Sequence, residues 1–180
     1  MTPIIRRELL GLLRAPWAAW ALTGWALGVA VLALIHWPAE GVGDLTGAAA
    51  LGVLRALAYG ALAGLLLVLP AFPAAAVVRE RAGGTLALLL NAPMRPGGIY
   101  AGKFAAILGL TAILLALTLP AAAASYALGG STISGGVGAL YLTLALLAVQ
   151  VTALGLYVSG RAQRVDGALR LTYGLVLGVA

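Results

Sequence analysis

Four long apolar runs constrain this chain more than any other feature of its sequence. They cover approximately residues 17–37, 46–78, 104–128 and 139–158. Roughly 20 apolar residues are enough for a helix to cross the hydrocarbon core of a bilayer. Only 9% of the residues are charged, which is too few to cover the surface of a water-soluble globule. The sequence therefore predicts an all-α fold, a polytopic helical membrane protein.

The charged residues predict how the chain is oriented in the membrane. The net charge is +6, and the Lys and Arg residues gather in three short clusters at the ends of apolar runs. This placement follows the positive-inside rule and does not resemble a nucleic-acid surface. The loop after the first run carries only the acidic Glu40 and Asp44, and the loop at residues 129–138 is uncharged. We therefore expect a cytoplasmic N-terminus and no nucleic-acid partner.

Residues 1–15 predict an amphipathic helix that lies in the membrane interface. Its apolar residues at helical spacing are Ile5, Leu9, Leu12 and Leu13. Arg7 and Arg14 fall on the opposite face, and Arg6 and Glu8 flank them. Such a helix rests its basic residues among anionic headgroups of the bilayer. The alternative is a simple solvated leader.

Prolines and glycines modify the four predicted spans. Pro70 and Pro73 should kink the inner end of the second span, and Pro120 lies inside the third. From Leu171 the chain begins a fifth apolar helix that stops after about ten residues, about half the length needed to cross. We expect residues 1–180 to form one transmembrane domain with a truncated fifth span, the N-terminal part of a longer domain. Three small-xxx-small pairs allow close helix packing: Gly24/Gly28, Gly60/Gly64 and Gly174/Gly178.

The segment at residues 79–103 concentrates polar and helix-breaking residues. It reads RERAGGTLALLLNAPMRPGGIYAGK. Thr85 can cap a short helix that carries leucines on one face and that Pro93 ends. The leucines of this face are Leu86, Leu89 and Leu90. A plain cytoplasmic loop is the alternative, but it would not require a glycine, a cap and a leucine face in this order.

This segment resembles the signature of ABC-2 type transporter permeases. That signature reads approximately E-R-x-x-G-T-L-x-L-L-x-x-x-P, followed by I-x-x-G-K. The matching residues are Glu80, Arg81, Gly84, Thr85, Leu86, Leu88, Leu89, Pro93, Ile99, Gly102 and Lys103. The resemblance implies that residues 79–103 form a coupling segment seated in a cleft of an ATP-binding subunit, with a leucine-faced helix filling the groove. Ala87 departs from the pattern, because the family often has an acidic residue there.

The resemblance also implies partners and a location. It implies a permease subunit of an ATP-binding cassette transporter, an exporter in the cell (inner or cytoplasmic) membrane. A separate ATPase subunit would bind ATP and Mg²⁺, this chain would bind no cofactor, and a second permease copy or homologue would complete the path. The alternatives are a non-transporting scaffold or assembly factor and, less favoured, an ion-coupled carrier, which needs acidic or broken-helix ion sites at mid-membrane.

The sequence contains no complete motif that predicts a catalytic site. Gly97, Gly102 and Lys103 match the first positions of a phosphate-binding P-loop, but Phe104 replaces the Mg²⁺-binding hydroxyl and no strand precedes it. The five carboxylates form no pair at helical spacing inside a span. There is no cysteine, and His36 alone cannot build a zinc site. We therefore expect no catalytic residue and no metal.

Two polar residues inside the apolar runs are candidates for a translocation path. Arg55 either reaches the outer interface or lines a polar cavity, because a charged residue at the bilayer centre costs about 3 kcal/mol. Gln150 lies near the middle of the fourth span, where its amide needs a partner on another helix or in an aqueous path. Both readings stay open for each residue.

Overall fold

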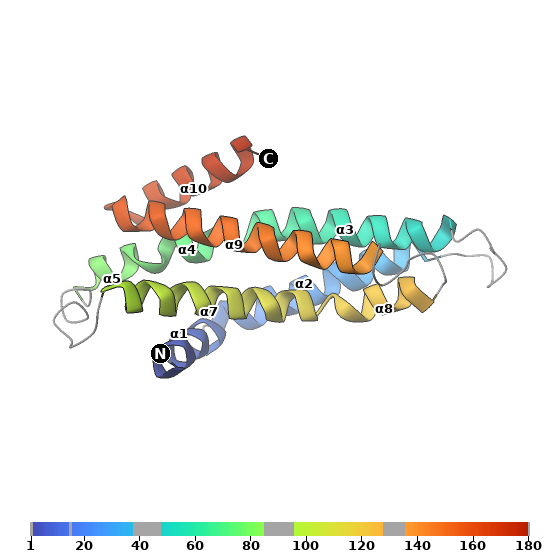
Figure 1. The fold of residues 1–180 in the computed structure, drawn as a ribbon, viewed down its shortest axis with the longest axis horizontal. Coiled ribbons are helices and arrows are strands. Elements are labelled where there is room, and N and C mark those ends of the chain that lie inside the picture. The colour runs from blue at the N-terminus through green and yellow to red at the C-terminus, as the bar shows by residue number, and fades with distance from the viewer. Residues whose placement is uncertain (1, 15, 38–47, 85–95, 128–135, 180) are drawn as a thin grey trace. The chain divides into compact units, whose positions relative to one another are not determined.

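The structure, a computed structural model, describes residues 2–14, 16–37, 48–84, 96–127 and 136–179. Every regular element among these residues is helical, as predicted (Figure 1). The helices are α1 (Thr2–Arg14), α2 (Pro16–Ile35), α3 (Ala48–Val68), α4 (Ala71–Ala76), α5 (Val78–Ala82), α7 (Pro96–Ala116), α8 (Leu119–Ala127), α9 (Gly138–Arg161) and α10 (Val165–Val179).

Four stretches of helix are long and apolar enough to cross a membrane. They are Ala18–Ile35, Leu51–Ala82, Gly97–Ala127 and Gly138–Arg161. Each of them coincides with one of the four predicted spans, apart from shifts at the ends. The fifth helix, α10, begins at Val165, ahead of the predicted start at Leu171. The charged side chains of its first turns are exposed, so they do not interrupt the helix.

The second and third spans are interrupted next to prolines, and the kink predicted at the inner end of the second span is present. Helix α3 ends at Val68, and Pro70 caps the start of α4. Helix α7 ends at Ala116, and Pro120 lies in the first turn of α8. In both places a proline lacks the N–H that would continue the hydrogen-bond ladder. Each of these two spans therefore consists of helical pieces.

The third span begins earlier than the sequence pattern predicted. Helix α7 starts at Pro96, whereas the prediction placed the start of the span at Phe104. Proline is favoured at the first helical position, because the N–H that it lacks has no partner there. Lys103 therefore lies inside α7 and not in a loop, and the residues that match the P-loop spacing are helical. They form no phosphate-binding loop.

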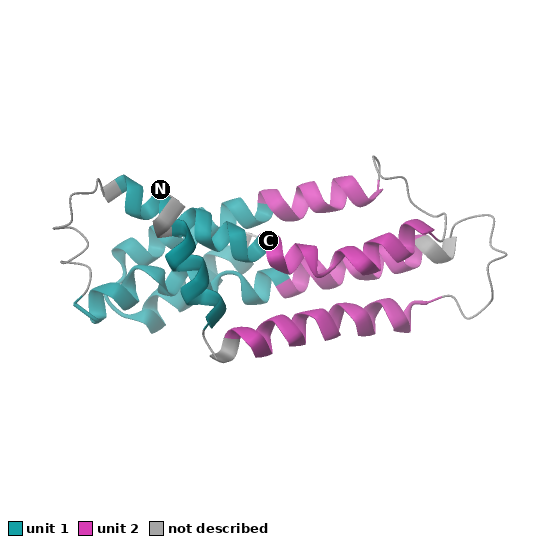
Figure 2. Ribbon diagram, turned by 90° about the horizontal axis from the view of Figure 1, so that it is seen from below, with its two compact units in different colours: residues 1–15, 65–111, 147–180 teal, residues 16–64, 112–146 magenta. Residues whose placement is uncertain are grey.

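The chain divides into two compact units, which Figure 2 colours separately. Unit 1 contains residues 1–15, 65–111 and 147–180. Its core is a cluster of small and branched side chains from α4, α5, α9 and α10, with Ala74, Val78, Val158 and Ala168 buried. Gly155 of α9 packs on Pro73 so closely that a Cβ atom there would lie 2.6 Å from the proline Cγ. This close approach requires glycine.

Unit 2 contains residues 16–64 and 112–146. Val29, Leu57 and Ala122 form its buried cluster, and Trp25 packs against it. The indole Nε1 of Trp25 donates a 2.9 Å hydrogen bond to the carbonyl of Leu114, near the end of α7. This bond satisfies a carbonyl beside the α7–α8 break. The tryptophan therefore stabilises the interruption of the third span.

The three predicted glycine pairs differ in how closely they pack against other helices. Gly60 and Gly64 of α3 face Leu32 and Trp25 of α2, and a Cβ atom at either glycine would clash with these side chains. Both contacts lie within unit 2. At the other two pairs, Gly24/Gly28 and Gly174/Gly178, a Cβ atom would meet no atom within 4 Å. Close packing is confirmed at the Gly60/Gly64 pair, and the other two pairs face open space in the described chain.

Candidate functional site

A chain of four charged side chains joins α1, α5 and α7 in unit 1. Lys103 Nζ lies 2.6 Å from Glu80 Oε1 and 3.3 Å from Glu8 Oε2. Arg7 Nη2 donates a 3.0 Å hydrogen bond to Glu8 Oε1. The exposed fraction of the side chain is 5% for Lys103 and 64% for Arg7. The charges therefore run from a solvent-facing cation to a buried one. We call Glu8, Glu80 and Lys103 the base cluster.

Three helices bring the base cluster together. Glu80 lies on α5, Lys103 on the early turns of α7, and Glu8 on α1. Helix α1 lies close to α7, since Leu9 Cδ2 would be 3.5 Å from a Cβ atom at Gly109. A buried ammonium group needs anionic partners, because its desolvation is otherwise costly. The two carboxylates meet that need.

The base cluster joins two helices that flank residues 85–95 in the sequence. Glu80 precedes that segment and Lys103 follows it, so their ion pair ties the two flanks together across unit 1. Glu8 adds the N-terminal helix to the same point. The base cluster therefore holds α5, α7 and α1 at one point.

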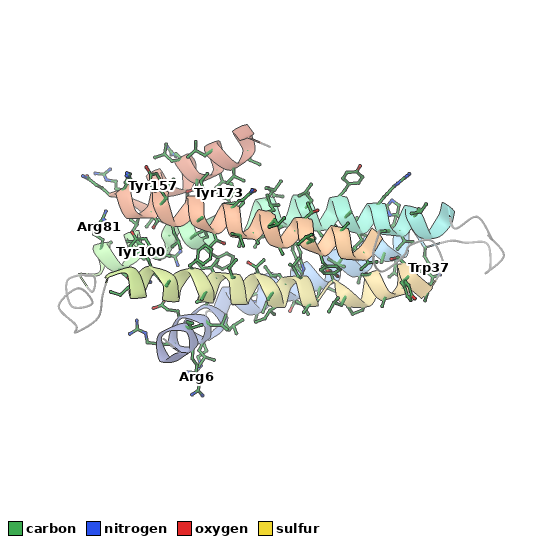
Figure 3. All side chains as sticks on the ribbon, viewed as in Figure 1. Arg6, Trp37, Arg81, Tyr100, Tyr157 and Tyr173 are labelled. Atoms are coloured by element: carbon green, nitrogen blue, oxygen red, sulfur yellow. The ribbon has the colours of Figure 1, made fainter. Side chains whose placement is uncertain are left out.

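Arg81 joins α5 to the end of α9. Its Nη1 donates a 2.7 Å hydrogen bond to the carbonyl of Ala162, and its Nη2 a 2.9 Å bond to the carbonyl of Gly160. The last carbonyls of a helix have no partner within the helix, and a guanidinium fork can satisfy two of them. Figure 3 labels Arg81 on α5 and Tyr157 on α9. Near the same end of α9, the Arg161 guanidinium lies 3.8 Å from the centre of the Tyr157 ring.

Ser159 of α9 stabilises the junction of α4 and α5. Its Oγ accepts hydrogen bonds from the backbone N–H groups of Val77, at 3.0 Å, and Val78, at 3.3 Å. The helix is interrupted at Val77, so these N–H groups need an acceptor from elsewhere. Ser159 is fully buried and supplies it. Arg81 and Ser159 thus connect the end of the second span to α9.

Gly84 ends α5 in a conformation that favours glycine. Its φ is +70°, in the left-handed region, and it follows Gly83, whose φ is −81°. A glycine in this conformation commonly terminates a helix. The predicted importance of Gly84 thus has a backbone reason. Side chains at Gly83 are compatible with its φ, whereas those at Gly84 are strained.

Several predicted coupling residues lie outside the described residues. These are Thr85, Leu86, Leu89, Leu90 and Pro93. The predicted leucine-faced helix and its role in coupling therefore stay predictions. Of the predicted coupling residues that are described, Glu80 belongs to the base cluster, Arg81 caps α9, and Gly84 marks the last residue before the segment.

The two residues predicted for a translocation path belong to different units. Arg55 lies on α3 in unit 2 and is exposed, and Tyr59 is exposed one turn further on. Gln150 lies near the middle of α9 in unit 1 and is also exposed. Both polar side chains are thus available to lipid, to another protein or to a translocated molecule. Their role stays a prediction.

Sequence reasoning missed three contributions to the site. Glu8 was placed at the flank of the amphipathic helix, but it faces α7 and Lys103. One signal was available, because Glu8 is the sole acidic residue among the first 15. The sequence pattern places Lys103 at the end of a loop, as part of the family motif, and does not indicate its ion pairs. No pattern in the sequence pointed to Ser159.

The described residues offer ionic and hydrogen-bonding contacts between helices. Among them no three His, Asp or Glu side chains gather closely enough to hold a metal ion. The base cluster can hold α1, α5 and α7 together and transmit a displacement, because its contacts join separate elements.

These spans define a multi-pass helical membrane protein. Residues 4–160 match the ABC-2 family transporter proteins, and the chain belongs to that family. The match includes most of α1, residues 79–103 and nearly all of α9. No curated protein matches the sequence. Members of this family generally work with an ATPase subunit.

Proposed function

We propose that this chain is the membrane-spanning permease subunit of an ATP-driven exporter. A separate ATPase subunit binds residues 79–103 from the cytoplasmic side, where the N-terminus also lies. ATP and Mg²⁺ belong to that subunit, and this chain binds no cofactor. A second permease copy or homologue completes the path in the cell membrane. Family membership and the clusters of basic residues at one end of the spans support this arrangement.

One observation carries the coupling proposal. The 2.6 Å ion pair between Glu80 and Lys103 joins the two flanks of residues 85–95. When the ATPase pulls or pushes that segment, the force reaches α5 and α7 at one point. Arg81 and Ser159 pass the displacement of α5 to α9. Gln150 lies on that same helix, where we propose it lines the translocation path, and Arg55 contributes from the second span.

Neighbouring glycines give a matched test of the coupling segment. Gly84→Ala forces an L side chain into the left-handed region, at a cost of about 1–2 kcal/mol, and redirects the chain that enters the segment. Gly83→Ala adds the same methyl group at an ordinary φ. We expect Gly84→Ala and Gly84→Pro to lower transport and ATPase association, while Gly83→Ala keeps both and all three variants insert into the membrane.

The leucine face is tested in the same way. Leu89→Asp should abolish association with the ATPase, because it places a charge on the apolar face. Ala87→Asp adds the same charge where the family often has an acidic residue, so it should keep association. Equal ATPase binding by both variants would refute a leucine-faced docking helix.

The runner-up is a non-transporting scaffold or assembly factor. It predicts that no ATPase co-purifies with the intact protein and that Leu89→Asp changes no transport activity. Co-purification in mild detergent, followed by an ATPase assay of the complex, separates the two functions.

A further inference from the structure

The charge chain of unit 1 has one end that the proposed function does not use. That end is Arg7, whose side chain is 64% exposed although it hydrogen-bonds to Glu8. Arg6 and Arg14 of the same helix are also exposed, and Figure 3 shows Arg6 projecting away from the bundle. Helix α1 therefore presents three cations on its outer side. Its inner side carries Glu8.

The outer side of α1 has the chemistry of a lipid-surface contact. Arg7, Gly11 and Arg14 follow one another at helical spacing and are all exposed, while the leucines of the helix are partly buried. Guanidinium groups bind phosphate with two parallel hydrogen bonds, and an amphipathic helix places such groups at headgroup level. Charge complementarity thus favours an anionic lipid surface as the occupant.

Glu8 divides its two oxygens between two cations. Oε1 accepts from Arg7 and Oε2 from Lys103. The two cations therefore compete for one carboxylate. A phosphate that binds Arg7 withdraws this cation from Glu8, and the whole charge of Glu8 then acts on Lys103. The contact between α1 and α7 becomes stronger as a result.

We propose that the headgroup phosphate of an anionic lipid binds Arg7 and thereby locks α1 onto α7 through Glu8 and Lys103. The lipid composition of the inner leaflet then sets how firmly the base cluster is held. Its effect on the coupling of ATP hydrolysis to transport rests on the proposed function. The docking of α1 itself does not, and it can be measured on the permease alone.

The distance between α1 and α7 reports this docking directly. The chain has no cysteine, so two cysteines can be introduced and spin-labelled without background. Gly11 on α1 is exposed and a Cβ atom there meets nothing within 4 Å, and Ala101 on α7 is exposed. The full-length protein with Gly11→Cys and Ala101→Cys is placed in nanodiscs of phosphatidylcholine alone or mixed with phosphatidylglycerol. Pulsed electron paramagnetic resonance then gives the distance distribution.

We expect phosphatidylglycerol to raise the ratio of docked to undocked α1 by about 1.5- to 5-fold, the range of a single partly exposed ion pair. Arg7→Gln and Glu8→Gln should each remove this response. Arg14→Gln removes the same positive charge from the same face, but Arg14 is outside the charge chain, so it should keep the response. Inorganic phosphate added to phosphatidylcholine nanodiscs should not reproduce the shift.

Three results would overturn the proposal. The first is a distance distribution that does not depend on phosphatidylglycerol. The second is an equal loss of the response in Arg7→Gln and Arg14→Gln, which would indicate an effect of total charge only. The third is a full response to inorganic phosphate. Because no ATPase is present, each result leaves the proposed transport function to be judged by its own experiment.

Discussion

The Glu80–Lys103 ion pair should be the strongest single polar contact of unit 1. Lys103 Nζ and Glu80 Oε1 lie 2.6 Å apart, and only 5% of the Lys103 side chain is exposed. Removing one partner of a buried pair costs about 3–5 kcal/mol, because the other charge remains desolvated. Glu80 is 18% exposed, and Glu8 remains as a second partner for Lys103. We therefore expect a cost just below that range for Glu80→Gln, about 2–3 kcal/mol.

A double-mutant cycle isolates the contribution of this pair. Lys103→Met keeps the length of the side chain and removes its charge, so it should cost about 3–5 kcal/mol. Adding Glu80→Gln to it should cost little more, which gives a coupling energy of about 2–3 kcal/mol. The same cycle with Glu8→Gln should give about 1 kcal/mol or less, because that contact is 3.3 Å long and Glu8 also binds Arg7.

The free energy of unfolding can be measured by titrating mixed micelles with a denaturing detergent. The fluorescence of the four tryptophans and the helical circular dichroism signal should report one transition. A coupling energy for Glu80 and Lys103 below about 0.5 kcal/mol would refute the base cluster, because unconnected sites are additive within that limit. Equal coupling for Glu8 and Glu80 would refute the assigned ranking of the two contacts.

Three further substitutions probe contacts around the base cluster. Ser159→Ala leaves the N–H groups of Val77 and its neighbour without an acceptor, and the free energy of unfolding should fall by about 1–3 kcal/mol. Gly155→Ala forces a methyl group against the ring of Pro73, which should cost about 1–3 kcal/mol in the same titration. Arg81→Lys loses the two-carbonyl cap of α9, and the cost should be about 0.5–1.5 kcal/mol, with faster hydrogen exchange in the last turn of α9.

Each of these substitutions has a control within the chain. Thr143→Ala removes a hydroxyl that donates to a carbonyl of its own helix, so its cost should stay near 0.5 kcal/mol or below. Gly174→Ala should stabilise α10 by up to about 1 kcal/mol, because the added methyl group meets no atom. Arg79→Lys changes an exposed arginine of the same helix and should leave hydrogen exchange in α9 unchanged. The assigned contacts are wrong if any control matches its partner variant.

Hydropathy predicted the spans well because it depends on composition over a long window. The four runs were found for this reason, whereas the kink near Pro70 was predicted from the chemistry of proline and the break near Pro120 was not predicted. The same logic placed Lys103 in a loop, because a charged residue usually ends an apolar run. In the structure its charge is neutralised by partners distant in sequence, which allows the helix to begin before it. A hydropathy window covers only neighbouring residues of the sequence, so it cannot indicate ion pairs between separate helices.

The candidate site was predictable in its local parts and not in its long-range contacts. The sequence singles out Gly84 within residues 79–103, and the left-handed conformation that it adopts after α5 is one that glycine commonly takes at the end of a helix. The bond from Val77 to Ser159 joins residues more than 80 positions apart, and a serine in an apolar helix carries no mark of such a role. Packing decides which side chain meets an unsatisfied backbone group.

The base cluster can keep Lys103 paired while the helices around it shift. Lys103 has two carboxylate partners on different helices, so a shift that lengthens one contact can shorten the other while the ammonium group stays paired. A buried cation with one partner would instead be left desolvated by the same shift, which costs several kcal/mol. Two alternative partners therefore reduce the barrier between arrangements of packed helices, and switching elements depend on such discrete arrangements. On this reasoning, Glu8→Gln should hinder a shift of α5 against α7 more than its small contribution to the free energy of unfolding implies.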